Sequence, residues 1–303
     1  MAPALSAAQK DRAIGAFVGL AVGDAVGTTL EFTTRDSRPP LTDMVGGGPF
    51  QLKPGEWTDD TSMAIALAES LIAKPDFDPR DLMSRFVNWW RWGKYSVTGE
   101  CFDIGMTTRV ALGAFEEGGS PFAGSTDPMS AGNGSLMRLS PVALWGLGRP
   151  WEQVRQVARD QSRTTHAAPQ CLDACEGYTA VLIEAIISGD LSAALKAGEQ
   201  CQAEEPISTI LSGGWQVKAR HQIASSGYVA HSLEASLWSI TETRDFASAV
   251  LMAANLGDDA DTTAAITGQL AGALYGKSGI PQSWLDRLAW CEELESLAQH
   301  LID

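Results

Sequence analysis

Residues 15–27 have the sequence GAFVGLAVGDAVG, with a glycine at every fourth position. On an α-helix, residues four apart share a face, so Gly15, Gly19, Gly23 and Gly27 would form one smooth stripe. Glycine lowers helix propensity, so this many glycines in one helix indicate a packing or site requirement. The stretch therefore predicts a helix whose glycine face lets another part of the backbone approach closely.

Helical periodicity dominates the rest of the chain, and convincing alternating strands are almost absent. No low-complexity linker or mid-chain shift in composition divides the sequence, so we predict one compact all-α domain over residues 1–303. Besides the glycine-rich stretch, helices are expected at residues 61–74, 80–92, 107–118, 135–148, 151–165, 169–189, 229–242, 246–257, 262–276 and 283–302.

The composition excludes some classes of partner. The 303 residues carry a net charge of −15, which argues against binding nucleic acid or anionic membranes through general electrostatics. An anionic substrate would need metal ions or local backbone donors to offset this charge. The five cysteines are odd in number and contain no CxxC pair, so we expect reduced thiols.

The N-terminal region from Ile14 to Leu30 is apolar enough to suggest a membrane span or a signal sequence. Asp24 in its middle, Glu31 at its end and the lack of a clear cleavage site argue against both. We therefore expect a soluble protein of the cytoplasm. We also expect a monomer.

Two acidic clusters, WTDDT at residues 57–61 and GDDADTT at residues 257–263, each precede a long helical pattern. Taken singly, either could simply cap a helix, with Thr58 as N-cap and Asp59 and Asp60 in the first turn. Neighbouring carboxylates repel one another, however, and a cation relieves this repulsion. Carboxylate and hydroxyl oxygens without nearby His or Cys suit Mg²⁺, Mn²⁺ or Ca²⁺. Together the clusters predict that two helix starts meet and hold hard cations.

These elements resemble the ADP-ribosylglycohydrolase family, which includes the dinitrogenase-reductase-activating glycohydrolases and the ADP-ribosyl-acceptor hydrolases. The resemblance covers almost the whole chain, and its most specific parts are WTDDT and the DxDT element at residues 259–262. The bacterial nitrogenase-regulating type looks closest. The matching stretches, in the family's order, are GAFVGLAVGDAVGTTLEF, GGGPFQLKPGEWTDDTSMAIALAESL, FDIGMTTR, SAGNGSLMR, TTHAAP and NLGDDADTTAAITGQLAGALYG.

The resemblance implies a single compact orthogonal helical domain with two divalent cations, Mg²⁺ or Mn²⁺, at the base of a cleft. The positions that match the family's metal-binding elements are Thr58, Asp59, Asp60, Asp259, Asp261 and Thr262. Many members have two glycines before the DxDT element, whereas here the second is Asp258. That difference adds a carboxylate beside the expected metals.

The resemblance also implies substrate contacts from Glu31, Asp103, Gly132, Asn133, Gly134, Ser135 and His166. Glu31 matches an acid that lies near the metals in some members. Asp103 matches an acid that faces the scissile bond in the nitrogenase-regulating type. Two alternatives remain open: Asp103 as a helix N-cap before residue 106, and His166 as a structural side chain in a helix-end loop.

The implied activity is metal-dependent hydrolysis of the N-glycosidic bond between ADP-ribose and a protein side chain, with arginine as the favoured acceptor. The partners are then an ADP-ribosylated protein and the product ADP-ribose. A metal-oriented water would attack the ribose, and Asp59, Asp60 or Asp259 would accept its proton. Asp103 would pair with the guanidinium or protonate the leaving group. The alternatives are another ADP-ribosyl linkage, on serine, a nucleobase or a small molecule, and a catalytically silent binding or structural member.

An acidic protein must also bind the pyrophosphate of ADP-ribose. Backbone N–H groups in glycine loops and at helix starts can serve this purpose. Arg138 is a further candidate, with an internal salt bridge as the alternative. Trp57, Phe102 and Tyr228 are candidates to stack on adenine, although tryptophans in an all-α core mostly fill space.

Overall fold

The computed structural model describes residues 4–74 and 76–303, and within them the predicted all-α fold is confirmed. This part of the chain contains isolated β-bridges but no strand. Its α-helices are α1 (Ala7–Gly27), α2 (Asp59–Ala73), α3 (Pro79–Trp92), α4 (Met106–Glu116), α5 (Ser140–Gly146), α6 (Trp151–Arg163), α7 (Pro169–Ser188), α8 (Leu191–Glu199), α9 (Ile207–Leu211), α10 (Val229–Thr241), α11 (Phe246–Ala254), α12 (Ala260–Tyr275), α13 (Gln282–Leu285) and α14 (Cys291–Ile302). Short 3₁₀ turns lie at Thr28–Leu30, Pro128–Ser130, Arg220–Gln222 and Lys277–Gly279.

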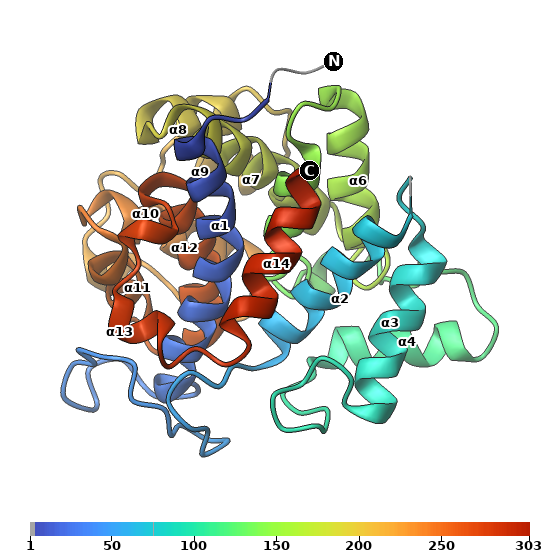
Figure 1. Cartoon of the computed structure of the whole chain (residues 1–303), viewed down its shortest axis with the longest axis horizontal. Coiled ribbons are helices and arrows are strands. Elements are labelled where there is room, and N and C mark those ends of the chain that lie inside the picture. Colours follow the sequence, from blue (N-terminus) through green and yellow to red (C-terminus); the bar gives the residue numbers. More distant parts are fainter. Residues whose placement is uncertain (1–3, 75) are drawn as a thin grey trace.

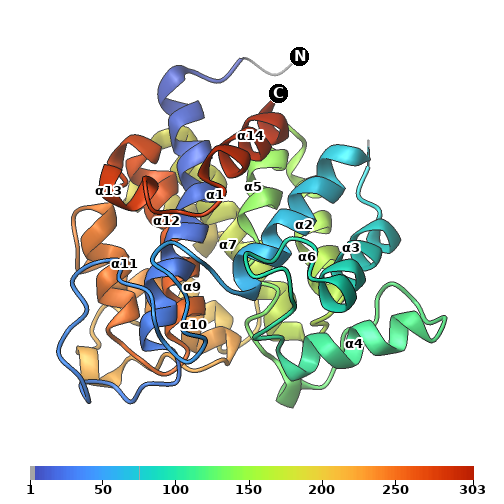
Figure 2. The same ribbon diagram turned by 60° about the horizontal axis from the view of Figure 1, so that its bottom comes forward.

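The glycine stripe of α1 packs directly on α12, and the two helices lie side by side at the centre of the molecule (Figures 1 and 2). A methyl group added at Gly15 would lie 2.5 Å from the carbonyl oxygen of Gly272, which is too close for any side chain. The predicted close approach of another backbone is therefore confirmed. The sequence did not identify the partner, which contributes glycines of its own at Gly268 and Gly272.

Other helices surround this pair. Helices α7, α11 and α14 pack on α1, and α6 and α8 pack on α7 in turn. Helices α2, α3 and α4 form one side of the molecule, with α4 at its periphery (Figures 1 and 2). Helix α2 also contacts α1 and α12, and hydrogen bonds from Thr61 to Asp24 and from Thr58 to Asp261 place its start beside the start of α12.

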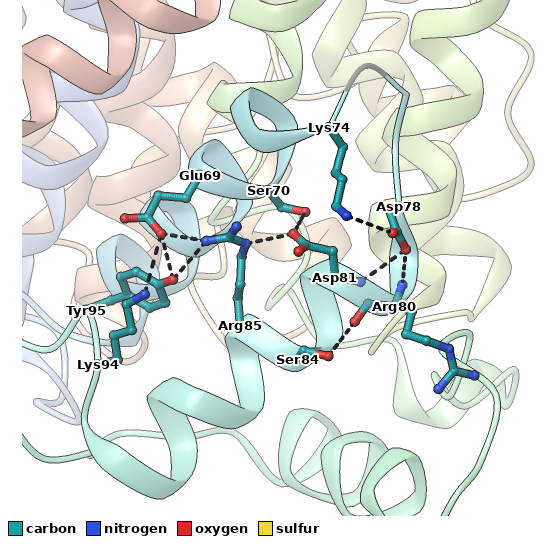
Figure 3. A network of polar contacts seen from close by, with 10 residues as sticks. All are labelled: Glu69, Ser70, Lys74, Asp78, Arg80, Asp81, Ser84, Arg85, Lys94 and Tyr95. Atoms are coloured by element: carbon teal, nitrogen blue, oxygen red, sulfur yellow. Dashed lines mark hydrogen bonds and ion pairs between the residues drawn. The ribbon is translucent and has the colours of Figure 1, made fainter.

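A network of charged and hydroxyl groups holds the C-terminal half of α2 against α3 (Figure 3). Arg85 donates from Nη1 to Glu69 Oε2 at 2.6 Å and from Nε to Asp81 Oδ2 at 2.7 Å. Ser70 also donates to Asp81 at 2.7 Å, and the Tyr95 hydroxyl donates to Glu69 at 2.8 Å. Both carboxylates are therefore satisfied by neighbouring donors, and the network anchors α2.

The structure corrects two helix predictions and contains two further helices. The predicted helix at 283–302 is broken into α13 and α14, with Trp290 between them at a φ of +52°. The predicted helix at 135–148 begins only at Ser140, since Pro141 lacks an N–H and suits a first helical turn. Helices α8 and α9 were not predicted.

The apolar N-terminal region forms a core helix. Residues 7–30 are long and apolar enough to cross a bilayer by length and composition alone, but 89% of their most apolar window is buried among other elements. All five cysteines are free, and Cys171 and Cys175 are buried on α7. The apolar N-terminal region is therefore a buried helix, in agreement with the close packing that its glycine stripe predicted.

Candidate active site

The first turns of α2 and α12 meet, although their acidic clusters lie about two hundred residues apart in the sequence. The Thr58 hydroxyl lies 3.3 Å from Asp261 Oδ2, and the Thr262 hydroxyl lies 3.2 Å from Asp60 Oδ2. Thr58, Asp60 and Asp261 are buried. The prediction that these helix starts converge is therefore confirmed.

Helix α2 is capped by a residue from another helix. Thr58 occupies the predicted N-cap position, but its side chain does not cap its own helix. Asp24 of α1 accepts hydrogen bonds from the backbone N–H groups of Thr58, at 2.9 Å, and Thr61, at 3.0 Å, and from both threonine hydroxyls. Asp24 thus satisfies N–H groups that a local cap normally serves.

Helix α12 is capped in the same way. Glu31, which follows the last turn of α1, accepts from the backbone N–H of Ala260 at 2.8 Å and of Asp261 at 3.3 Å. The N-cap residue Asp259 makes no side-chain cap hydrogen bond. Because Asp24 and Glu31 provide the caps, Asp59, Asp259 and Asp261 are free to face a shared space.

That space is a pocket of about 460 Å³. Six acidic residues line it, and the described lining contains no lysine or arginine. The acidic lining residues are Glu31, Asp59, Asp103, Asp258, Asp259 and Asp261. Thr262 also lines the pocket, whereas Thr58 and Asp60 lie behind the lining, at the junction of the two helices.

The acidic cluster has the chemistry of a site for hard divalent cations. Oxygen atoms of Glu31, Asp259 and Asp261 lie within 4.8 Å of one another. Asp60 Oδ1 is buried and accepts no hydrogen bond from the described residues, so it remains available to a ligand. Burial and the nearby Asp261 raise the pKa of Asp24 to about 7 and that of Asp259 to about 8. A divalent cation would relieve this repulsion, so the residues fit such an ion.

The structure places Glu31 beside the acids that match the family's metal-binding elements, as the resemblance implied, and because Glu31 also lines the pocket its substrate contact stays a prediction. It lies with Asp259 and Asp261 in the acidic cluster and caps α12. Burial, followed by Asp261 and other acids, raises its pKa far above the usual range. Glu31 therefore belongs with the candidate cation ligands.

The loop predicted to contact the ligand forms one wall of the pocket. Gly132, Asn133 and Gly134 line it, and Asn133 donates to Asp259 at 2.5 Å and to Ser232 at 2.8 Å. The side chain of Ser135 is turned into the core, where Ser162 donates to it at 2.8 Å, so it does not line the pocket.

His166 lies under the two glycines of this loop. A methyl group at Gly134 would meet its Cε1 at 2.6 Å, so the glycine allows the ring to lie against the backbone. Burial and the nearby Arg138 lower the pKa of His166 to about 3, which keeps the ring neutral. Its Nδ1 pairs with the Thr165 hydroxyl at 2.8 Å. His166 therefore presents Nε2 near the pocket and also supports the loop.

Asp103 lines the pocket, and the alternative that it caps α4 is wrong. The N-cap of α4 is Gly105, and no side chain caps this helix. Asp103 has a φ of +59°, which is uncommon for a non-glycine residue. Burial, together with Asp59 and Asp261, raises its pKa to about 11. Its carboxyl group thus belongs to the same acidic site.

Two of the other expectations for ligand binding are corrected. Arg138 is wholly buried, donates to Gln161 and Thr165 and lies 4.5 Å from the Phe86 ring centroid, so it neither faces the pocket nor makes a salt bridge. Trp57 is also buried, edge-on to Trp290, and therefore fills the core.

The other two adenine candidates already have aromatic neighbours. Phe102 lies 5.2 Å from Phe50, and Tyr228 lies 5.1 Å from His231, both measured between ring centroids. Each is half-buried, at residues next to Asp103 and Gly227 of the pocket lining.

Sequence reasoning missed two contributors to the site. Asp24 was not predicted to belong to the site, although a carboxylate inside a glycine-striped apolar helix indicates a buried polar role. The first turn of α4 was also missed. Residues 105–108 line the pocket, and their helix start carries no side-chain cap.

Comparison with known proteins agrees with this arrangement. The family model described as ADP-ribosylglycohydrolase matches residues 5–303. The chain belongs to the ADP-ribosylglycohydrolase family. A solved structure described as an ADP-ribosylglycohydrolase-related protein complex superposes with a TM-score of 0.86 at 40% identity. The match covers 97% of this chain and 98% of that one.

Several relatives in this family carry functional names. ADP-ribosylarginine hydrolase Tri1 of Pseudomonas putida (strain GB-1) is 46% identical over 97% of this chain and 78% of its own length. Tri1 of Serratia proteamaculans (strain 568) is 45% identical over 96% and 79%. The ADP-ribosyl-[dinitrogen reductase] glycohydrolase of Rhodospirillum rubrum is 36% identical over 92% and 90%.

Proposed function

We propose that this protein is a dinuclear-metal-dependent hydrolase that releases ADP-ribose from modified arginine side chains of proteins. The observation that carries the proposal is the pocket of six acidic residues with no lysine or arginine in its described lining. The ADP-ribosylarginine hydrolases at 45% and 46% identity favour arginine as the acceptor. We also propose that the protein acts as a monomer in the cytoplasm, as expected from its sequence.

The residues that would hold two divalent cations, Mg²⁺ or Mn²⁺, come from three elements. They are Glu31 after α1, Thr58, Asp59 and Asp60 at the start of α2, and Asp259, Asp261 and Thr262 at the start of α12. When bound, such ions neutralise the acidic cluster, orient the ribose hydroxyls and lower the pKa of a water.

The chain itself supplies donors for the pyrophosphate. The first turn of α4 points free N–H groups toward its uncapped start, and residues 105–108 line the pocket. The positive end of the helix dipole favours an anion there. Gly134 lines the same pocket on the neighbouring loop, whereas the N–H of Gly132 already donates to the Ser130 carbonyl at 2.8 Å. These groups can bind pyrophosphate without a basic side chain.

Different acidic residues can serve the attacking water and the acceptor arginine. Asp60 lies behind the pocket lining, and Asp259 is held by Asn133 at 2.5 Å, so Asp59 is the best placed to take a proton from the attacking water. Asp103 lines the pocket and caps no helix, which leaves its carboxyl group available to the acceptor arginine. Burial and the neighbouring acids raise the pKa of Asp103 to about 11, so the group can protonate the departing arginine, which is the second of its expected roles.

A release assay tests this function. Free ADP-ribosyl-arginine is incubated with the protein in Mg²⁺ or Mn²⁺, with and without chelator, beside ADP-ribosyl-serine and an ADP-ribosylated nucleobase. We expect release of ADP-ribose from the arginine conjugate only when the cation is present. Turnover of the serine or nucleobase conjugate alone would overturn arginine specificity, and no turnover of any conjugate would favour a silent family member.

A further inference from the structure

The mouth of the pocket exposes an aromatic side chain on a constrained backbone. Phe32 has a φ of +56° and Asp258 a φ of +61°, and both line the pocket. Their segments are joined by hydrogen bonds from Phe32 N to the Asp258 carbonyl and from Asp258 N to the Thr33 carbonyl, each 2.8 Å long. Left-handed conformations cost energy at non-glycine residues. This pairing nevertheless holds Phe32 with 68% of its surface exposed and Asp258 in solvent.

Helix α4 extends the apolar mouth outward. Met106 lines the pocket and is 72% exposed, and Val110, one turn further along, is 63% exposed. Residues four apart share a helix face, so these two side chains lie on one face of α4, beside the exposed Arg109. The opposite face of α4, with Ala111 and Leu112, is buried on the side of α3. Figure 2 shows α4 at the edge of the molecule, where its outer face is free of other helices.

We propose that Phe32, Met106, Val110 and Asp258 form a docking surface, here named the mouth surface, for the protein that carries the ADP-ribosylated arginine. This inference rests on the proposed function and adds a preference for the carrier protein. The partner it fits is a basic protein surface with apolar side chains beside the modified arginine.

The first reason to assign a docking role to the mouth surface is that it is continuous with the pocket. Phe32, Met106 and Asp258 line the pocket and are also exposed, so a carrier protein whose modified side chain enters the pocket must cover them. Exposed apolar side chains beside a site are typical of interaction surfaces.

The second reason concerns the partner: the negative charge of this protein favours a basic carrier. Asp258 lies at the exposed rim, and the chain as a whole carries a net charge of −15, which two divalent cations in the pocket would offset only in part. Such a field attracts a basic carrier and repels an acidic one, and the effect weakens as salt is added.

The experiment compares three substrates: free ADP-ribosyl-arginine, mixed histones modified on arginine as the basic carrier, and ovalbumin modified on arginine as the acidic carrier. The variants are Val110→Lys and Val110→Glu, which lie outside the pocket lining and differ in charge. The matched control is Val217→Lys, since Val217 is 91% exposed and lies near Trp238, toward the far end of α10 from the pocket loop.

For the wild type we expect kcat/KM to be higher on histones than on ovalbumin, with a difference that shrinks as salt is raised. Val110→Lys should lower kcat/KM on histones about tenfold, Val110→Glu should preserve or raise it, and Val217→Lys should leave it unchanged. All three variants should match the wild type on free ADP-ribosyl-arginine.

The mouth surface is overturned if the wild type uses both carriers equally, or if Val110→Lys and Val110→Glu act alike on histones. The proposed function fails by a separate result, the absence of turnover of free ADP-ribosyl-arginine by the wild type. In that case, equal capture of modified histones by the wild type and Val110→Lys in a binding assay would also overturn the mouth surface.

Discussion

The acidic groups at the two ends of α2 have opposite surroundings: those at one end have hydrogen-bond donors, and those at the other face further acids. At its C-terminal half, Glu69 and Asp81 surround Arg85, and Figure 3 shows a donor for each carboxylate. At its N-terminus, Asp59 and Asp60 face further acids, and one oxygen of Asp60 has no partner. Acids that are satisfied within the fold stabilise it, whereas acids left unsatisfied at the site need a ligand from outside. We call Glu69, Asp81 and Arg85 the satisfied cluster, and the acids at the starts of α2 and α12 the unsatisfied cluster. The first is structural and the second is functional.

The largest effect should follow from neutralising the unsatisfied cluster. Asp261→Asn keeps the shape of the side chain but removes the charge that lies near Thr58 and Asp24. Polarisation by a bound ion is worth several kcal/mol, so kcat/KM for ADP-ribosyl-arginine should fall at least about 100-fold.

The matched control is Glu242→Gln, a change at an exposed acid on another face that should keep full turnover. Circular dichroism should show unchanged helix content in both variants. Turnover of Asp261→Asn within twofold of the wild type would mean that the acidic cluster is not the reaction centre.

The sequence predicted the acids of the unsatisfied cluster, but it did not predict which residues cap the two helices that carry them. The glycine spacing of α1 and the two acidic elements are local patterns, and they correctly indicated a packed helix and converging helix starts. The caps from Asp24 and Glu31 join residues that are distant in sequence, so no local pattern reveals them. The same is true of Arg138, whose partners in the core depend on the packing of α6 against the loop before α5.

The second effect is stabilisation by cations. Mg²⁺ or Mn²⁺ should raise the melting temperature of the wild type by several degrees, since a ligand at 100 times its Kd contributes about 2.7 kcal/mol. Asp261→Asn should lose most of this shift. In chelator, the same variant should melt at or above the wild type, because it removes repulsion among buried acids. A cation-induced shift of equal size in both proteins would contradict the assignment, and thermal denaturation measures it.

The third effect tests the satisfied cluster. Arg85→Met removes the partner of Glu69 and Asp81 while keeping much of the apolar stem, and we expect a loss of about 1–2 kcal/mol in the free energy of unfolding. The control is Lys74→Met, at an exposed ion pair with Asp78 that should contribute less than about 0.5 kcal/mol. Urea denaturation gives both values. Activity should persist in both variants, and its loss in Arg85→Met at full stability would link the two ends of α2.

The smallest effect is the pH dependence of the satisfied cluster. Burial works to raise the pKa of Asp81, but hydrogen bonds from Arg85 and Ser70 outweigh it, and the pKa is lowered. A carboxyl group with a lowered pKa stabilises the fold above its unfolded-state pKa, and this stabilisation is lost as pH falls through the folded-state value. The difference in unfolding free energy between the wild type and Arg85→Met should therefore be full near pH 7 and shrink toward pH 3. A difference that stays constant over this range, measured by urea denaturation at each pH, would show that Arg85 stabilises the fold through packing of its stem and not through its charge.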